Sequence, residues 1–370
     1  MKKAISSLLV LGLVFSTSYS VKAATAGTST RLYGKGRVQT AAKIAGESWN
    51  GAWKTSKKAV IAPAGDKNLV DALAVSPLAY KLNAPILLND QKDSISADTL
   101  KELKSRAISK VYIATGQGVI SDKAVKQLQD LNITVERLGG KNRFETAQNI
   151  YNAYKNNGGK IDTIALVSPN ALADALSISS TAASEGMPIL LTNTEGTDIC
   201  NDSVSALNSA DTIYAVGGTG VIKDELIGKL DADRLGGNDR FETNNEVLKA
   251  FAARGKFKFD KVYLANGLNN HLVDALTGSV LAAQSKSPVV LVNDDINSST
   301  AEMLKDNVTK ATKVVGFGGN AVINDKIMKR ADTIVAGISG DGGATKPDDN
   351  KDNTNKPDNN PNNLHVIEVK

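Results

Sequence analysis

One short phrase, rich in arginine and glycine, occurs three times in this chain at intervals of about a hundred residues. It occupies 31–37, 137–143 and 234–240, and each copy begins with Arg-Leu and ends with a second arginine. A chain in which a unit of this length recurs folds as an array of similar structural units. Triplication also favours a binding surface over a catalytic centre, because avidity rises with copy number while one active site is sufficient for turnover.

Two further motifs follow each copy at nearly constant spacing. An Asp-Ala-Leu tripeptide begins 40, 37 and 40 residues after the first arginine, and a proline that opens an apolar run follows each aspartate after 14 residues. The aspartates are Asp71, Asp174 and Asp274, and the prolines are Pro85, Pro188 and Pro288. Spacing this regular indicates that the three copies fold alike.

Within each copy, short apolar runs alternate with helical patterns. In the second copy we expect strands at 163–167, 189–191 and 212–216 and helices at 174–184 and 202–208. Continuous apolar strands flanked by helices are typical of a parallel sheet covered on both faces. The sequence therefore predicts an α/β fold of three tandem doubly wound units, and the Ala/Ser-rich helix after each Asp-Ala-Leu suggests very close packing.

The two ends of the chain differ from the repeats in composition. Lysines followed by an apolar run predict a secretory signal peptide at 1–23, and Asp, Asn, Lys and Pro predict a disordered tail at 340–370. The apolar run is shorter than the roughly 20 residues that span a bilayer, so we expect no membrane insertion. The repeats are then expected at 24–135, 136–233 and 234–339.

The phrase also carries a helix start. In copies two and three, Asn142 with Glu145 and Asp239 with Glu242 have the spacing of a capping box. The first copy has Gly36 and Gln39 instead, which predicts a weaker cap. Each Asp-Ala-Leu aspartate can act as a helix cap, as a buried partner of a repeat arginine or as a ligand contact, and the sequence leaves these roles open.

The paired arginines have two interpretations. A guanidinium group suits a carboxylate or a phosphate, so its partner can be an internal aspartate or an anionic polymer. The sequence favours neither. The pairs are Arg31 with Arg37, Arg137 with Arg143, and Arg234 with Arg240.

Catalytic, metal and cofactor sites are poorly supported. The chain has two histidines, His271 and His365, and one cysteine, Cys200, which cannot assemble a zinc site with two or three histidines in the repeats. The glycine clusters after the strands do not complete a dinucleotide-binding fingerprint, and tight turns explain them better. We therefore expect no enzyme activity, no cofactor and no nucleic-acid partner.

The three motifs together resemble the type 2 clostridial cell-wall-binding repeat over 31–339. The resemblance implies Rossmann-like modules around a pseudo-threefold axis that bind an anionic secondary cell-wall polymer, teichoic-acid-like or polysaccharide, without a covalent bond. It also implicates the proline-led motif in binding. Copy one departs from the pattern at Tyr33, Val38 and Gln39, and copy three departs at Val289 and Val290.

We therefore expect a secreted, noncatalytic protein that anchors to the Gram-positive cell wall or cell surface, with other surface-layer proteins as candidate partners. The alternative is a cell-wall hydrolase or amidase-associated protein, of the N-acetylmuramoyl-L-alanine amidase type, acting on peptidoglycan. A soluble small-ligand-binding protein would need a closed pocket in each repeat. The expected polymer-binding residues are Arg31, Arg37, Asp71, Pro85, Leu87, Arg137, Arg143, Asp174, Pro188, Leu190, Arg234, Arg240, Asp274, Pro288 and Val290.

Overall fold

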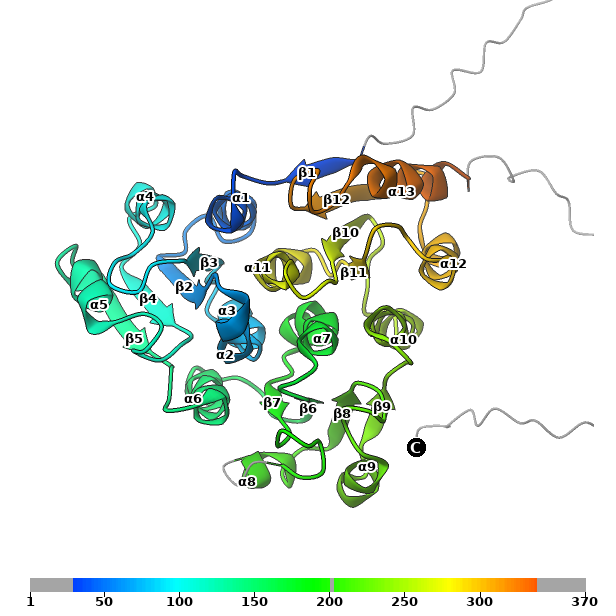
Figure 1. Cartoon of the computed structure of the whole chain (residues 1–370), viewed down its shortest axis with the longest axis horizontal. Coiled ribbons are helices and arrows are strands. Elements are labelled where there is room, and N and C mark those ends of the chain that lie inside the picture. The colour runs from blue at the N-terminus through cyan, green and yellow to red at the C-terminus, as the bar shows by residue number, and fades with distance from the viewer. Residues whose placement is uncertain (1–28, 200–202, 338–370) are drawn as a thin grey trace, which may run out of the picture.

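Three four-stranded parallel sheets, each flanked by helices, are arranged around a pseudo-threefold axis (Figure 1). The computed structural model describes residues 29–199 and 203–337. The expected signal peptide at 1–23, the tail at 340–370, Cys200 and His365 lie outside the described residues.

The sheets confirm the expected α/β architecture. Every pairing between neighbouring strands is parallel. The first sheet has the order β3-β2-β4-β5, with β2 (Lys58–Pro63), β3 (Ile86–Asn89), β4 (Lys110–Ile113) and β5 (Thr134–Arg137). The second has the order β7-β6-β8-β9, with β6 (Thr163–Val167), β7 (Ile189–Leu191), β8 (Thr212–Val216) and β9 (Asp233–Leu235). The third has the order β1-β12-β10-β11, with β1 (Thr30–Leu32), β10 (Lys261–Asn266), β11 (Val289–Val292) and β12 (Lys313–Phe317).

The helices form an inner, a bridging and an outer group. The inner group is α2 (Leu69–Ala72) with α3 (Val75–Lys81), α7 (Leu172–Glu185) and α11 (Leu272–Gln284). The bridging group is α1 (Arg37–Asn50), α6 (Arg143–Asn156) and α10 (Arg240–Ala253). The outer group is α4 (Ala97–Ser105), α5 (Asp122–Gln129), α8 (Val204–Leu207), α9 (Asp224–Leu230), α12 (Ser298–Asn307) and α13 (Asp325–Gly337). None of these helices, over 29–199 and 203–337, is long and apolar enough to cross a membrane.

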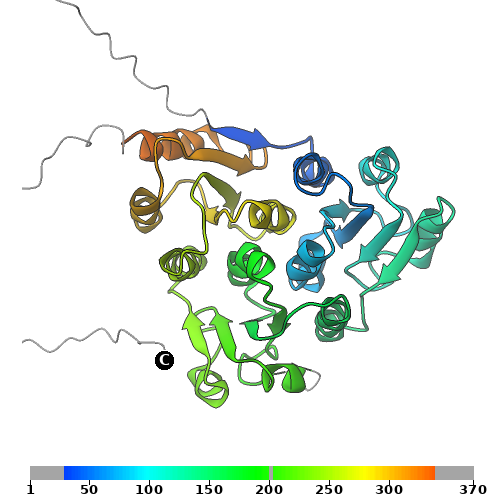
Figure 2. The same ribbon diagram turned by 180° about the vertical axis from the view of Figure 1, so that it is seen from behind.

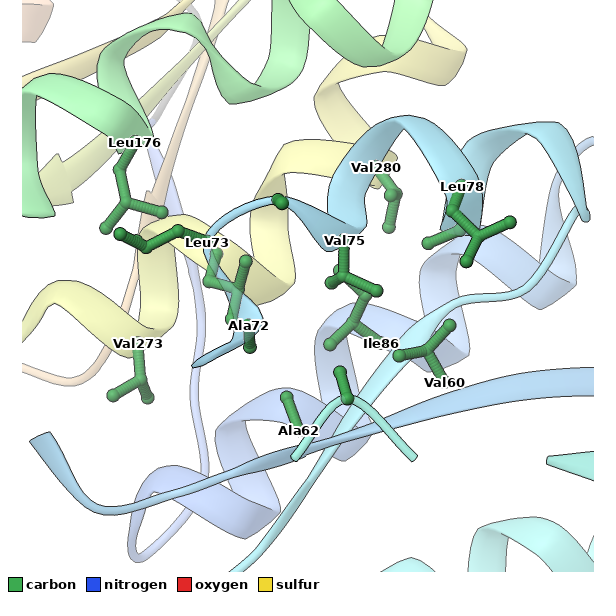
Figure 3. Packing of buried hydrophobic residues seen from close by; sticks show 14 of the residues in the cluster. Val60, Ala62, Ala72, Leu73, Val75, Leu78, Ile86, Leu176, Val273 and Val280 are labelled. Carbon is green, nitrogen blue, oxygen red and sulfur yellow. The ribbon is translucent and has the colours of Figure 1, made fainter. Parts of the chain in front are cut away.

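The inner helices meet at the centre of the molecule, where α7 contacts both α3 and α11. Small side chains let the helices approach closely: the hydroxyls of Ser76 in α3 and Ser279 in α11 are 2.8 Å apart and buried. Leu73, Leu176 and Val273 come from the three copies and belong to one buried cluster (Figure 3). The close packing expected of these helices is confirmed.

The sheets are offset from the sequence repeats. Strand β1, which carries Arg31, pairs with β12 and so completes the third sheet rather than the first. The next helix, α1, packs against β3 of the first sheet and against α11. Strand β5 with α6, and β9 with α10, connect the neighbouring sheets in the same way. Each arginine-glycine phrase is therefore the junction between two sheets.

The same arrangement closes the ring of units. Figure 2 shows β1 beside β12 and α13, at the far end of the chain. The Ser29 backbone N–H and hydroxyl donate to the Asp332 carboxylate at 3.1 and 2.8 Å. The Arg31 guanidinium donates to the Ile323 carbonyl at 2.8 Å and to the Asp325 carboxylate at 2.7 Å. These bonds fasten the first described residues to the last unit.

We expect that a chain beginning at residue 34, without β1, is less stable by about 3–5 kcal/mol, because it loses the ladder to β12 and the bonds of Ser29 and Arg31. Thermal unfolding measures the change. A chain beginning at residue 29, which keeps β1, is the control. Equal midpoints for the two chains would show that β1 does not hold the ring.

Candidate functional site

Three pockets lie at the carboxyl ends of the strands, one at each junction between sheets. We name each pocket by its aspartate and its second arginine: the first pocket holds Asp71 and Arg143, the second Asp174 and Arg240, and the third Asp274 and Arg37. Their volumes are about 840, 630 and 310 Å³. Ligands of open α/β sheets bind at this edge of the strands. The third pocket exists only because β1 closes the ring.

A glycine turn forms one wall of each pocket. Gly217 has φ +136° and Gly318 has φ +110°, a conformation that favours glycine. A Cβ on either glycine would also lie 3.2 or 3.1 Å from the carboxylate of Asp174 or Asp274. In the first pocket Thr115 replaces this glycine, and its hydroxyl donates to Asp71 at 2.7 Å. The tight turns expected of the glycine clusters are confirmed.

The Asp-Ala-Leu aspartates lie in the first turn of the inner helices and in the pocket walls. Asp174 and Asp274 are 8% and 5% exposed. Burial, against the attraction of Arg240, raises the pKa of Asp174 to about 6. Burial, against the attraction of Arg37, raises the pKa of Asp274 to about 7. Burial also raises the pKa of Asp71, while Thr115 and Arg143 favour its ionised form.

Each aspartate therefore faces the second arginine of the next unit around the ring, so that the aspartate of the third copy faces Arg37 of the first. Partnership with a repeat arginine was one of the three roles that the sequence left open for these aspartates. Arg240 donates to the Gly267 carbonyl at 2.8 Å and to Asn269 Oδ1 at 2.6 Å. Arg37 donates to the Ala64 carbonyl and the Asp66 carboxylate, both at 2.9 Å. These arginines link adjacent units across the pockets.

The first arginines have a different environment. Arg31, Arg137 and Arg234 each donate to a backbone carbonyl of the glycine turn or the residues just after it, at 2.7–3.2 Å. Each also forms an ion pair with the aspartate that begins the outer helix after that glycine turn. These aspartates are Asp325 in α13, Asp122 in α5 and Asp224 in α9. The arginine side chains are only 19–22% exposed. An internal role thus accounts for their donors, although Arg137 also lines the first pocket.

The predicted N-caps are confirmed, but each glutamate accepts from the residue before the N-cap and not, as in a capping box, from the N-cap residue itself. Asn142 accepts from the backbone N–H groups of Phe144 and Glu145 at 2.9 Å, and Glu145 accepts from the N–H of Lys141 at 2.8 Å. Asp239 and Glu242 repeat this pattern. In the first copy Gly36 provides no side-chain cap, and Gln39 donates to Asp98 instead. The N-cap turns fix the direction in which Arg143 and Arg240 leave their helices.

The proline-led motifs lie elsewhere. Leu87, Leu190 and Val290 are completely buried in strands β3, β7 and β11. Pro85, Pro188 and Pro288 are buried just before those strands, and each accepts a backbone hydrogen bond from the neighbouring strand. The structure thus places these six residues in the core, apart from the pocket linings. Their contact with a polymer stays a prediction that would need them to leave the core.

The sequence analysis did not identify the loop that joins β2, β6 or β10 to the inner helix that follows it. Lys67 lines both the first and second pockets, and Asp66 lines the second while pairing with Arg37 near the third. Asn269 lines the second pocket, and His271 lines the third. The three pockets therefore converge around this loop. The signal was its position just before each Asp-Ala-Leu, but its residues differ among the copies, so the repeat pattern did not mark them.

The described residues include no group of three or more His, Cys, Asp or Glu side chains that could hold a metal ion. The pocket linings offer guanidinium and ammonium groups, amide and hydroxyl groups, and carboxylates. This arrangement can bind a polar, charged ligand through hydrogen bonds and ion pairs.

The sequence profile of the family described as Cell wall binding domain 2 (CWB2) matches residues 31–125, 137–227 and 234–328. Two curated proteins of Bacillus subtilis (strain 168) are similar to this chain. N-acetylmuramoyl-L-alanine amidase LytC is 27% identical over 308 residues, which are 83% of this chain and 58% of that protein. The protein named Amidase enhancer is 27% identical over 303 residues, 80% of this chain and 39% of that protein. The chain thus spans about half the length of these relatives or less.

Two solved structures share the fold. Cwp8 from Clostridium difficile has a TM-score of 0.70 and 32% identity, with 84% of this chain and 52% of that chain covered. Cwp6 from Clostridium difficile has a TM-score of 0.73 and 27% identity, with 87% of this chain and 50% of that chain covered.

The raised pKa of Asp274 predicts how stability depends on pH. The folded chain holds this proton more tightly than the unfolded chain, whose pKa is 3.8, so the free energy of unfolding falls as pH rises from about 4 to about 7. Asn resembles the neutral carboxyl group, and Asp274 Oδ1 has no hydrogen-bond partner among the described residues. We expect Asp274→Asn to stabilise the fold by about 2–4 kcal/mol at neutral pH and to flatten this pH dependence.

Denaturant unfolding at several pH values measures the effect, and Asp211→Asn on the surface is the control. If Asp274→Asn destabilises the fold at neutral pH, the carboxylate is ionised and makes a net stabilising contact there.

Proposed function

This chain belongs to the cell wall binding domain 2 family, and from that membership we propose that it is held noncovalently on the cell wall by an anionic secondary wall polymer bound in the three pockets. Membership itself supports association with the cell wall or cell surface. The proposal includes the polymer and its chemistry, teichoic-acid-like or polysaccharide. It also includes export through the signal peptide at 1–23 and contact with surface-layer proteins.

One observation carries the proposal: three pockets built from the same residue types converge around the Asp66–Lys67 loop. A repeating polymer presents the same group many times along its length. Once one group is bound, the next binds at high effective concentration, so three weak sites give strong retention. A ligand with a single recognised group would use the three sites only one at a time.

The chemistry of the linings fits a charged polysaccharide or polyol phosphate. Each pocket offers an arginine, whose planar donors match phosphate and carboxylate oxygens. Asparagine side chains and the glycine turns offer groups that hydrogen-bond to hydroxyls. The second arginines and Arg137, with Asp71, Asp174 and Asp274, are the part of the predicted site that these pockets support.

The alternative function is peptidoglycan hydrolysis, or assistance to an amidase. The names of the two Bacillus relatives favour it, as does the raised pKa of Asp174, which has Asp239 close by in the second pocket. We propose binding without catalysis, because the linings show an arginine beside an aspartate at each junction rather than a nucleophile beside a base.

We expect the protein to sediment with purified Gram-positive walls and to lose this retention when acid extraction removes the secondary polymer. Increasing the salt concentration about tenfold should weaken retention, because the ion pairs with the polymer are partly exposed to solvent and are screened. Sedimentation with quantified supernatant measures both effects. Retention that survives extraction would redirect the assignment to peptidoglycan itself.

We also expect purified protein incubated with labelled walls to release no soluble fragments above the buffer blank, with or without added zinc. A known amidase on the same walls is the positive control. Release that depends on protein concentration and is lost with Asp174→Asn would establish the hydrolytic alternative.

A further inference from the structure

The second arginines occupy equivalent positions but have unequal partners. Arg37 is paired with Asp66 at 2.9 Å and also donates to the Ala64 and Asn270 carbonyls. Arg240 donates to the Gly267 carbonyl and to Asn269. Among the residues that the structure describes, the Arg143 guanidinium has no hydrogen-bond or ion-pair partner.

One sequence difference matches the loss of the side-chain partner. Asp66 and Asn269 each stand five residues before the Asp-Ala-Leu aspartate, and each accepts a hydrogen bond from its arginine. In the second copy this position is Pro169, whose side chain has no acceptor. The donors of Arg143 therefore stay available to a ligand.

The lining of the first pocket is also the most positively charged of the three. The first pocket is lined by four basic side chains, Lys67, Arg137, Lys141 and Arg143, and by two acidic ones, so its formal charge is +2. The second has two basic and three acidic side chains, a formal charge of −1. The third has two basic side chains and one aspartate, a formal charge of +1, but Asp66 pairs with its arginine.

The two carboxylates of the first pocket are already engaged. Asp71 accepts from Thr115, and Glu145 accepts from the backbone N–H of Lys141. The N–H of Gly140 donates to Thr146. The cationic side chains that can hold an anion here are Arg143 at the junction and Lys67 and Lys141 beside it.

We propose that the three pockets are unequal and that the first pocket is the principal subsite for an oxyanion, with Arg143 as its specificity-determining residue. Arg37 and Arg240 mainly tie adjacent units together. This inference rests on the proposed function, and it identifies which group of the polymer is recognised, a phosphate or a carboxylate, and where.

Backbone amide NMR of the full chain tests the proposal at constant ionic strength, with inorganic phosphate and glucuronate as probes. We expect shifts centred on 116–119 and 139–143 in the first pocket. Arg143→Gln should weaken binding of the preferred probe by about tenfold or more. Arg143→Lys should keep part of the affinity because it keeps the charge. The equivalent variants Arg37→Gln and Arg240→Gln, at the other two pockets, should each weaken it less than about twofold.

Pro169→Asp supplies the carboxylate that copy one has at this position, and it should weaken binding in the first pocket without touching Arg143. Equal losses from the three Arg→Gln variants, or shifts centred on the second or third pocket, would overturn the proposal. So would unchanged affinity in Arg143→Gln.

Wall sedimentation of the same variants separates this inference from the proposed function. Probe binding at Arg143 in a protein that walls do not retain would refute wall anchoring and leave the oxyanion site intact. Wall retention that the three Arg→Gln variants weaken equally would refute the inequality and leave wall anchoring intact.

Discussion

The contact among the three inner helices determines where everything else lies. Helices α3, α7 and α11 contact one another, and small side chains permit the approach, as where Ser76 of α3 meets Ser279 of α11. A larger side chain there would push the sheets apart, since protein interiors are close-packed. The distance between the helices also sets the distance between a strand edge and the next glycine turn. The pocket widths therefore depend on residues that lie outside the pocket linings.

Structural and binding roles are closely interleaved at the junctions. The same phrase supplies one arginine that holds a glycine turn and, six residues later, another that faces a buried aspartate in the neighbouring unit. An unpaired buried carboxylate is costly, so the arginine that compensates it is restrained. Where the internal partner is absent, as at Pro169, the restraint is removed. On the proposed assignment, a substitution at a position outside the motif is sufficient to release the junction arginine for ligand binding.

The sequence predicted local structure well and long-range structure less well. The strands of the second copy lie at 163–167, 189–191 and 212–216 as expected, because continuous apolar runs are distinctive. The helix expected at 174–184 lies within α7, whereas α8, at Val204–Leu207, is shorter than expected in its described part. The offset of β1 into the third sheet could not be foreseen, because pairing between distant parallel strands leaves no local pattern. The apolar character of Leu87, Leu190 and Val290 did indicate burial. They were included among the expected polymer-binding residues only because the family resemblance implicates the proline-led motif in binding.

Because β1 lies in the third sheet and α13 packs beside it, the first and last described residues share one corner of the molecule. Tension applied at residue 29 or at residue 337 therefore enters through the same unit. A force applied at residue 29 along the axis of β1 acts in shear between β1 and β12. The hydrogen bonds between these two strands then resist the force together rather than one after another. The first and second sheets lie off that line of force. The protein can bear a pull at this corner while the pocket at the opposite junction, between the first and second sheets, keeps its shape.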